Sequence, residues 1–305
     1  MDVKRLWWRF EALLVKGLFA LARRLGVRRA SALGGGALRR LGPWLPVSAV
    51  GRRNLELAFP DSDPAWRDAV LRDAWDNLGR SMLEMPLVAS LGETAEGPGW
   101  EVAGAENLPA AGTRMISFSA HLANWEVLPR AALRFGIALA SLYRAPDNPF
   151  VDAEVRRMRE GSAELPLFPK GSRGARAALK HLSGGGALGL VVDQKLNEGL
   201  AIPFFGHPAM TAPAVAEFAL RFRCPLVPTH VERIGPARFR VVVEPPLALP
   251  DSGDRAEDVR LLLTAVNACM ERWVRARPGE WLWLHRRFPK DVYRAQPTTS
   301  SAPAA

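Results

Sequence analysis

The spacing of apolar residues changes near residue 97, and the change predicts two kinds of structure in one chain. Between residues 28 and 91 the apolar positions recur at helical spacing, interrupted at Gly34-Gly35-Gly36 and by two prolines. The segment Pro60-Asp61-Ser62-Asp63-Pro64 predicts a helix start, with Asp63 as the N-cap and Pro64 at the first helical position. We therefore expect a helical region over residues 25–97.

Beyond residue 97, short apolar runs alternate with stretches of helical spacing. The expected strands are 114–118, 137–143, 166–168, 187–192, 225–231 and 239–243. The expected helices are 126–135, 149–160, 173–182, 211–222 and 254–275. This alternation predicts an α/β domain over residues 98–290, with a mixed, mostly parallel sheet flanked by helices. Residues 291–305 are expected to form a disordered tail, because 296–305 consists mostly of Pro, Thr, Ser and Ala.

Residues 1–24 are apolar but interrupted by charge. The basic residues fall within a narrow stripe when the segment is wound as a helix; they are Arg5, Arg9, Lys16 and Arg23. No uncharged run approaches the roughly 18 residues of an ordinary membrane span, and Glu11 also argues against a secretory signal. We expect an amphipathic helix in or against a cytoplasmic leaflet, with basic side chains reaching the headgroups. A helix packed on the protein's own core and a short tilted span remain as alternatives.

The composition narrows the classes of partner. Two cysteines, Cys224 and Cys269, exclude a disulfide framework and a cysteine-based zinc site. The net charge of +10 fits a phosphorylated lipid, an anionic leaflet or an acidic carrier protein. Nucleic acid is not an expected partner, because the sequence has no helix-turn-helix, zinc-finger or stacked-aromatic signature.

The segment His121-Leu122-Ala123-Asn124-Trp125-Glu126 follows an expected strand and holds a candidate base with a candidate orienting carboxylate. A five-residue step on one helix turns about 140°, so the two side chains would lie on different faces. They can converge only if the backbone changes type between them. The alternative is a His that ends a strand and a Glu in the first turn of the next helix, where its charge suits the helix dipole.

Seven blocks in order resemble the late acyltransferases of lipid A assembly, within the wider glycerolipid and lysophospholipid acyltransferase group. The blocks are Arg-Asn-Leu-Glu-Leu-Ala-Phe-Pro at 53–60, Asn-Leu-Gly-Arg at 77–80 with Glu84, the segment 121–126, Tyr-Arg-Ala-Pro-Asp-Asn-Pro at 143–149, Asp193-Gln194, Pro-Phe-Phe-Gly at 203–206, and Trp-Leu-Trp-Leu-His-Arg-Arg-Phe at 281–288. They span nearly the whole chain except the tail. A Glu rather than an Asp five residues after the His points to the lipid A branch.

The resemblance implies transfer of a fatty acyl chain from an acyl-carrier-protein thioester to a hydroxyl of a phosphorylated glycolipid, expected to be a lipid A precursor. The expected location is the cytoplasmic face of the bacterial inner membrane. His121 would take the proton of the attacking hydroxyl, and Glu126 would orient the imidazole. Backbone amides near Asn124 or a nearby arginine are candidate oxyanion donors. We expect no metal and no cofactor beyond the acyl-carrier thioester.

The same resemblance implies four substrate-binding residues: Arg144, Arg159, Asp193 and Asn124. Guanidinium groups suit bidentate recognition of phosphate, although a solvated surface charge is the alternative for each arginine. Asp193 closes an expected strand, where α/β sheets place their chemistry, or is a turn residue. Residues 281–288 are expected to form a closing strand with structural aromatics, which leaves His285 off the catalytic list. Residues 203–206 either line an acyl-chain channel or fill the core.

Three alternative functions remain. The acceptor could be another glycolipid, such as a phosphatidylinositol mannoside, or a lysophospholipid. The chain could be a lipid-binding relative without activity, although such a protein has no need of the intact His121 and Glu126 pair. A thioesterase would use water as the acceptor, and the arginines would then have no substrate to recognise.

Overall fold

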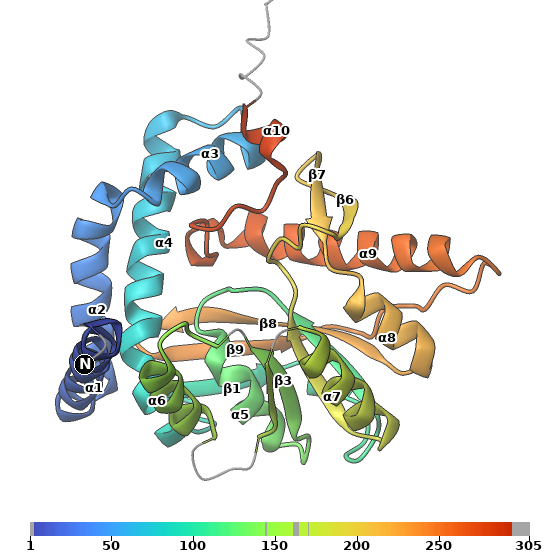
Figure 1. Ribbon diagram of the computed structural model, residues 1–305, viewed down its shortest axis with the longest axis horizontal. Coiled ribbons are helices and arrows are strands. Elements are labelled where there is room, and N and C mark those ends of the chain that lie inside the picture. Colours follow the sequence, from blue (N-terminus) through green and yellow to red (C-terminus); the bar gives the residue numbers. More distant parts are fainter. Residues whose placement is uncertain (1–2, 144, 161–164, 170, 295–305) are drawn as a thin grey trace, which may run out of the picture.

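The computed structural model describes residues 3–143, 145–160, 165–169 and 171–294. Helices formed by the first part of the chain stand beside an α/β domain (Figure 1). These helices are α1 (Val3–Leu25), α2 (Val27–Leu41), α3 (Ser48–Ala58) and α4 (Pro64–Glu84), with the 3-10 turns η1 (Gly42–Trp44) and η2 (Met85–Ser90). The predicted cap of α4 is confirmed, because the Asp63 side chain accepts a hydrogen bond from the backbone N–H of Ala65 at 2.6 Å.

Helices α2 and α4 cross closely through glycines. A Cβ atom on Gly34 would lie 2.2 Å from the carbonyl oxygen of Gly79, and one on Gly79 would lie 2.1 Å from that of Gly34. The two backbones can approach this closely only because neither residue has a side chain. Helix α4 is thereby held between α2 and the rest of the molecule, with Val70, Leu71 and Trp75 buried.

The predicted mixed, mostly parallel sheet is confirmed. Seven strands lie in the order β1-β9-β8-β2-β5-β3-β4, and only the β8–β9 pair is antiparallel. These strands are β1 (Gly99–Ala103), β2 (Met115–Ser119), β3 (Leu139–Tyr143), β4 (Leu167–Pro169), β5 (Ala187–Val191), β8 (Leu226–Gly235) and β9 (Arg238–Val243). A separate antiparallel pair is formed by β6 (Leu200–Phe204) and β7 (His207–Thr211). The sequence patterns had not predicted β1, β6 or β7.

The helices of the α/β domain follow the predicted order with two corrected starts. They are α5 (Leu128–Leu133), α6 (Pro149–Glu160), α7 (Ser172–Ser183), α8 (Ala214–Phe222), α9 (Arg255–Ala276) and α10 (Lys290–Arg294), with the 3-10 turns η3 (Ala105–Asn107), η4 (Trp125–Val127) and η5 (Pro278–Glu280). The helix predicted from 211 begins at Ala214 because Thr211 ends β7, and the helix predicted from 126 begins as η4. The tail prediction is wrong for 291–294, which form part of α10; residues 295–305 lie outside the described part.

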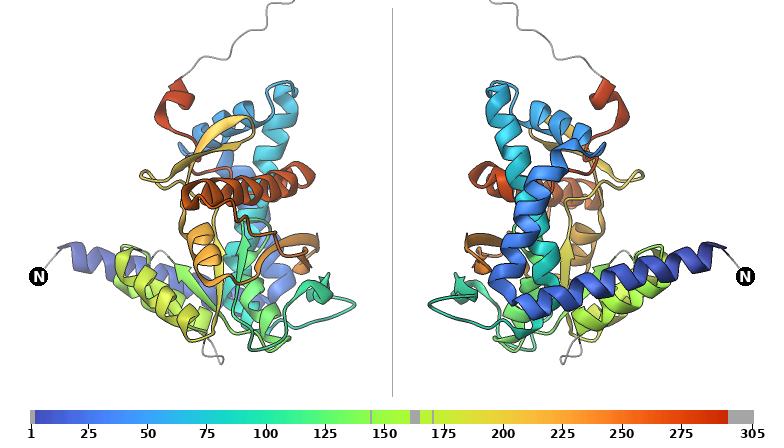
Figure 2. Two further views of the ribbon diagram at one scale, coloured as in Figure 1. Left: turned by 90° about the vertical axis from the view of Figure 1, so that its right-hand side faces the viewer. Right: turned by 90° about the vertical axis from the view of Figure 1, so that its left-hand side faces the viewer.

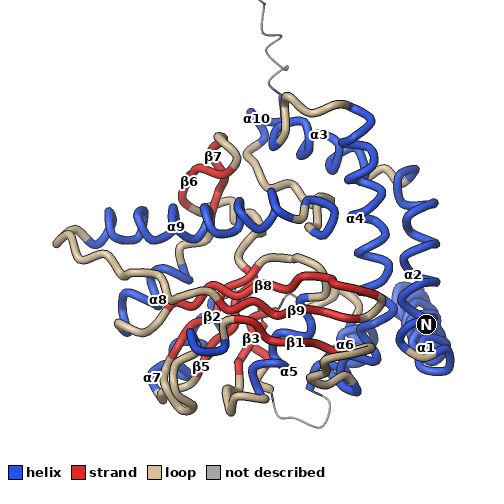
Figure 3. The backbone as a smooth tube through the Cα atoms, turned by 180° about the vertical axis from the view of Figure 1, so that it is seen from behind, coloured by secondary structure: helices blue, strands red, loops and turns tan. Residues whose placement is uncertain are grey.

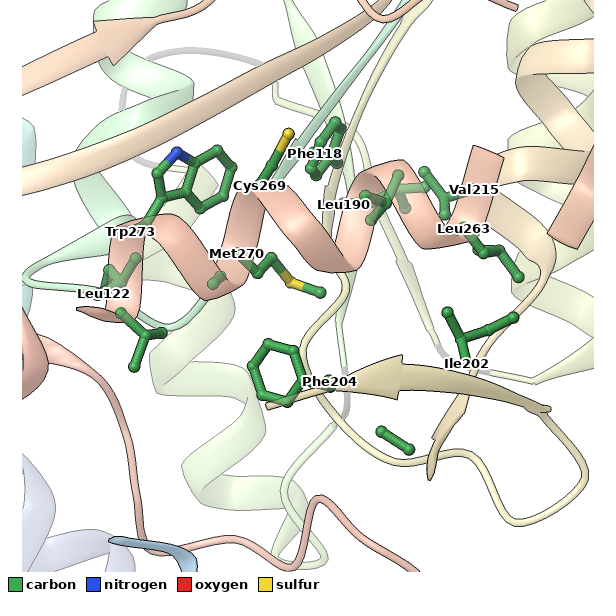
Figure 4. Packing of buried hydrophobic residues seen from close by; sticks show 14 of the residues in the cluster. Phe118, Leu122, Leu190, Ile202, Phe204, Val215, Leu263, Cys269, Met270 and Trp273 are labelled. Carbon is green, nitrogen blue, oxygen red and sulfur yellow. The ribbon is translucent and has the colours of Figure 1, made fainter. Parts of the chain in front are cut away.

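Hydrophobic clusters cover the two faces of the sheet. Helices α8 and α9 lie on one face of the sheet (Figure 3). Phe118 and Leu190 pack on this face together with Trp273 of α9 (Figure 4). On the other face Met115 and Leu139 pack with α5 and η2. Successive side chains of β2 therefore point to opposite faces of the sheet, as the two-residue period of a strand requires. Ser117 and Ser119 point to the α5 side, where the cavity described below lies.

Helix α1 extends away from the sheet domain and runs beside α6 (Figure 2). Its buried residues are few: Ala12, Phe19 and Ala22. Its large apolar side chains are mostly exposed, namely Val3, Leu6, Trp7, Phe10, Leu13, Leu14, Leu18 and Leu21. Among the helices in the described ranges, none is both long enough and apolar enough to span a bilayer.

Candidate active site

His121 and Asp193 come together because the strands that precede them are neighbours. Strands β2 and β5 are parallel, and Ser119 pairs with Val191 in their register. His121 and Asp193 each lie two residues beyond that pair, so both emerge at the carboxyl edge of the sheet. This edge is where open α/β sheets place their ligand sites.

The carboxylate that contacts the imidazole is Asp193. His121 Nδ1 lies 2.6 Å from Asp193 Oδ1, and the backbone N–H of His121 donates to Oδ2 at 2.9 Å. Trp281 Nε1 also donates to Oδ2, at 2.8 Å. Burial alone would raise the pKa of Asp193, but its charge interaction and hydrogen bonds with His121 outweigh burial and hold that pKa well below the usual range. An ionised Asp193 accepts the hydrogen bond from Nδ1–H, so Nε2 is the ring nitrogen left to accept a proton from a substrate.

The orienting role predicted for Glu126 is therefore corrected by this contact. Glu126 is bound instead by Arg159, which donates from Nε to Oε2 at 2.9 Å and from Nη2 to Oε1 at 2.5 Å. Burial would lower the pKa of Arg159, but the charge and hydrogen bonds of Glu126 raise it above its ordinary value. The fork-like pair fixes the plane of the guanidinium group. Glu126 and Arg159 form a second unit beside the His121–Asp193 pair.

His285 also reaches this site, although the sequence pattern had left it out. Its Nε2 lies 3.1 Å from the carbonyl oxygen of Asp193, which places the proton on Nε2, and its ring is 6.5 Å from that of His121 between centroids. Burial lowers the pKa of His285, so this ring is neutral. The strand predicted for 281–288 is wrong: the segment forms turns, with a single isolated bridge between Leu122 and Trp281.

A cavity of about 280 Å³ opens beside these residues. Its polar lining includes His121, Glu126, Arg130, Arg159 and Gln194, together with serines of the sheet. The apolar part of the lining comes from the sheet, α5, η2 and the segment before β4, and includes Met85, Val88, Leu128, Leu139, Leu142, Leu165 and Leu167. A basic imidazole and a guanidinium group thus border a mainly aliphatic pocket, which suits a substrate with a reactive polar end and a hydrocarbon chain.

The other predicted site residues have different places. Asn124 is fully buried and does not line the cavity: its amide donates to Glu84 Oε2 at 2.9 Å, and its Oδ1 accepts from the backbone N–H of Glu126. Asp193 is likewise buried behind His121. Arg144 lies outside the described residues. Direct contact between substrate and the side chains of Asn124 or Asp193 is not supported by this geometry.

Several residues of the site region were missed or left undecided by the sequence patterns. The sequence predicts Trp281 only as a structural aromatic, but its indole N–H also donates to the carboxylate that orients His121. Phe204 and Phe205 of the 203–206 block pack on Trp281 and Trp283, so they fill core rather than line the cavity. The only sequence feature that points to Trp281 is its place in the 281–288 block, and this place does not indicate that its indole binds Asp193.

The sequence of this chain is similar to those of known bacterial acyltransferases. Residues 8–290 match the model of a family described as bacterial lipid A biosynthesis acyltransferase. The lipid A biosynthesis palmitoleoyltransferase of Escherichia coli (strain K12) is 23% identical over 250 residues, which cover 79% of this chain and 78% of that protein. The lipid A biosynthesis acyltransferase of Shigella flexneri matches with the same identity and coverage. The crystal structure of the 1-acyl-sn-glycerophosphate acyltransferase PlsC from Thermotoga maritima aligns with a TM-score of 0.40 and 13% identity, over 90% of this chain and 99% of that one. Because the family match extends over residues 8–290, this chain belongs to the bacterial lipid A biosynthesis acyltransferase family.

Proposed function

We propose that this protein transfers a fatty acyl chain from an acyl-carrier-protein thioester to a hydroxyl of a lipid A precursor, expected to be the 3-hydroxyl of an acyl chain already attached. The observation that carries the proposal is the His121–Asp193 pair at the wall of an aliphatic cavity. An aliphatic hydroxyl is a poor nucleophile, so its attack on a thioester needs a base held in one tautomer. Asp193 supplies that restraint.

In the proposed reaction every bond and proton is accounted for by His121, the thioester and the acceptor hydroxyl, without a further cofactor. His121 Nε2 accepts the hydroxyl proton while the hydroxyl oxygen bonds to the thioester carbonyl carbon. The tetrahedral intermediate then collapses, the C–S bond breaks, and the leaving thiolate takes the proton from Nε2. The products are an ester on the acceptor and the free thiol of the carrier protein. Buried Asp193 stabilises the imidazolium during this cycle without changing its own protonation.

Arg159 is proposed to bind the phosphorylated acceptor. Its guanidinium lines the cavity, and Glu126 holds it in one plane. A guanidinium group in a fixed orientation suits the geometry of phosphate oxygens. Arg144 remains a proposed second phosphate ligand. Asn124 contributes indirectly in this scheme, because its Oδ1 accepts from the backbone N–H of Glu126.

We further propose that the protein works on the cytoplasmic face of the inner membrane, with α1 lying in the interface. Asn148, at the start of α6, donates to the backbone carbonyl of Trp8 at 2.8 Å and to Glu11 at 2.9 Å. Helix α6 carries Arg159, so the helix proposed to meet lipid is tied to a wall of the cavity. Trp44, in the turn after α2, is 88% exposed and would suit the same interface.

The test is mass spectrometry of a lipid A precursor incubated with the purified protein and a mixed pool of acyl-carrier thioesters. We expect a new acyl ester that is absent with His121→Ala. Transfer to a lysophospholipid but not to the lipid A precursor would replace the acceptor in the proposal. Free fatty acid as the only product would indicate a thioesterase. No turnover with any donor or acceptor, from folded and membrane-bound protein, would overturn the enzymatic function.

A further inference from the structure

The active-site segment 121–126 contains a strained and fully buried turn. Ala123 has a φ of 46°, a left-handed conformation that is unfavourable for residues other than glycine. Its carbonyl oxygen accepts from Asn77 Nδ2 at 3.1 Å and from Ser81 Oγ at 2.9 Å. Its backbone N–H donates to the carbonyl oxygen of Glu280 at 3.0 Å. Helix α4 therefore holds the backbone between the proposed base and the residue that binds Arg159.

One turn of helix further along α4, Glu84 is fully buried and makes four hydrogen bonds. Arg233 donates to it from Nη1 at 2.6 Å and from Nη2 at 3.0 Å. Ser31 Oγ donates at 2.6 Å, and Asn124 Nδ2 donates at 2.9 Å. The carboxylate thus joins α2, α4, β8 and the active-site segment at one point.

Arg233 also contacts the two side chains of α4 that donate to the carbonyl oxygen of Ala123. Its Nε donates to Asn77 Oδ1 at 3.0 Å, and its Nη2 lies 3.3 Å from Ser81 Oγ. The guanidinium also lies 4.9 Å from the ring centroid of Phe239. Arg233 therefore orients both side chains that hold the carbonyl group of Ala123.

We propose that Glu84 and Arg233 are a buried positioning pair for the active site, acting through Asn124 and the Ala123 turn. Asn124 is the link: its amide donates to Glu84, and its Oδ1 caps η4 by accepting from the backbone N–H of Glu126 at 3.3 Å. The pair thereby sets the place from which Glu126 reaches Arg159. This inference rests on the proposed function, because it concerns the rate of the same transfer.

A stabilising role alone is a poor explanation for a charge pair at this depth. Burying two ions costs several kcal/mol each, and an apolar pair of similar volume is often equally stable. What an apolar pair lacks is the acceptor for Asn124. The two roles can therefore be separated by variants that remove the charges but keep or remove that acceptor.

The first experiment compares two double variants, Glu84→Gln/Arg233→Met and Glu84→Met/Arg233→Met. Neither leaves a buried charge without its partner, and only the first keeps an oxygen that can accept from Asn124. We expect kcat of the Gln/Met variant about fivefold below wild type, because Asn77 and Ser81 lose their contacts with Arg233. We expect kcat of the Met/Met variant about 100-fold below wild type and a higher KM for the phosphorylated acceptor, because Asn124 then has no acceptor at position 84 and Glu126 no longer holds Arg159. Equal kcat in the two folded variants would overturn the proposal.

A second comparison uses single hydroxyl deletions that carry little risk of misfolding. Ser81 and Ser48 are both buried serines that donate to a backbone carbonyl, Ser81 to Ala123 at 2.9 Å and Ser48 to Gly42 at 2.7 Å. We expect Ser81→Ala to lower kcat about tenfold and Ser48→Ala to leave it unchanged, with similar changes in Tm. The same kcat in both variants would contradict positioning through the Ala123 turn.

An NMR readout separates this inference from the proposed function. Arg159 Nε–H is held by Glu126, so its resonance is expected to exchange slowly with water in wild type and to be identified by its loss in Arg159→Lys. We expect the signal to persist in the Gln/Met variant and to disappear in the Met/Met variant. If wild type transfers no acyl chain, the proposed function fails, while this resonance still tests the positioning. Persistence in the folded Met/Met variant would overturn the inference.

Discussion

At the scale of single residues, the two carboxylates near His121 have separable roles. Asp193→Asn is expected to lower kcat by about three to four orders of magnitude, because an amide can favour the wrong tautomer of the imidazole and cannot stabilise its charge. Glu126→Gln keeps an oxygen for Arg159, so we expect a smaller loss of kcat and a higher KM for the phosphorylated acceptor. Steady-state kinetics with the acceptor varied will measure both. An equal collapse of kcat in the two variants would mean that Glu126 also acts on His121.

His285 gives the site a dependence on pH that concerns stability rather than the chemical step. Burial lowers its pKa in the folded protein below the ordinary value of about 6.5. The unfolded chain then binds more protons than the folded protein as pH falls below about 6.5, so the free energy of unfolding decreases there. Urea denaturation at pH 7.5 and 5.5 should show this loss, and His285→Gln should reduce it. Because the pKa of His230 is lowered by burial as well, part of the loss should remain.

The sequence predicted which residues lie at the candidate site but not which of them contact one another. The sequence identified His121, Glu126 and Asp193 because each falls in a block that resembles the family, and Arg159 because the resemblance favours an arginine on the helix after the 143–149 block. It could not show that Asp193 holds the imidazole, since that contact depends on β5 lying next to β2 in the sheet. The strand order is a property of the folded chain and leaves no local mark around either residue.

At the scale of elements, the crossing of α2 and α4 determines where the residues of α4 reach the active site. Gly34→Ala would place a Cβ atom 2.2 Å from the carbonyl oxygen of Gly79, so the helices must separate. We expect a loss of about 1–3 kcal/mol in the free energy of unfolding, measured by urea denaturation, together with lower activity. Gly36→Ala is the control on the same helix, because its Cβ would meet only the flexible end of Arg40 at 3.2 Å. It should keep or raise stability, since alanine favours a helix over glycine. Equal losses in both variants would show that helix propensity, not the crossing, decides the effect.

Elements were predictable where a long apolar pattern had one interpretation. Helices α6 and α9 and strands β2 and β5 lie within a residue or two of their expected bounds. Strands β6 and β7 were missed because Pro203 and Pro208 argue against strand pairing. The aromatic run 281–288 was misread for the opposite reason: its Trp side chains are buried by packing on β6 and η5 rather than by membership of a sheet.

At the scale of the whole molecule, the exposed face of α1 is the feature that most requires a partner. Leu13 and Leu14 are 66% and 59% exposed on a helix that extends from the body (Figure 2). Burying an apolar side chain of this size is worth about 1.5–3 kcal/mol, so Leu13→Glu/Leu14→Glu should weaken binding to anionic phospholipid vesicles by about 100-fold or more in a sedimentation assay. Leu261→Glu, at a 47% exposed position on α9, is the matched control and should bind normally. The α1 variant should keep its Tm, because the two leucines contact solvent in the isolated protein. It should lose activity on vesicle-bound acceptor more than on acceptor dispersed in detergent, since only the former requires the protein to reach a membrane. Unchanged vesicle binding, or a Tm lowered as far as that of a core variant, would instead favour the alternative in which α1 packs on the protein's own core.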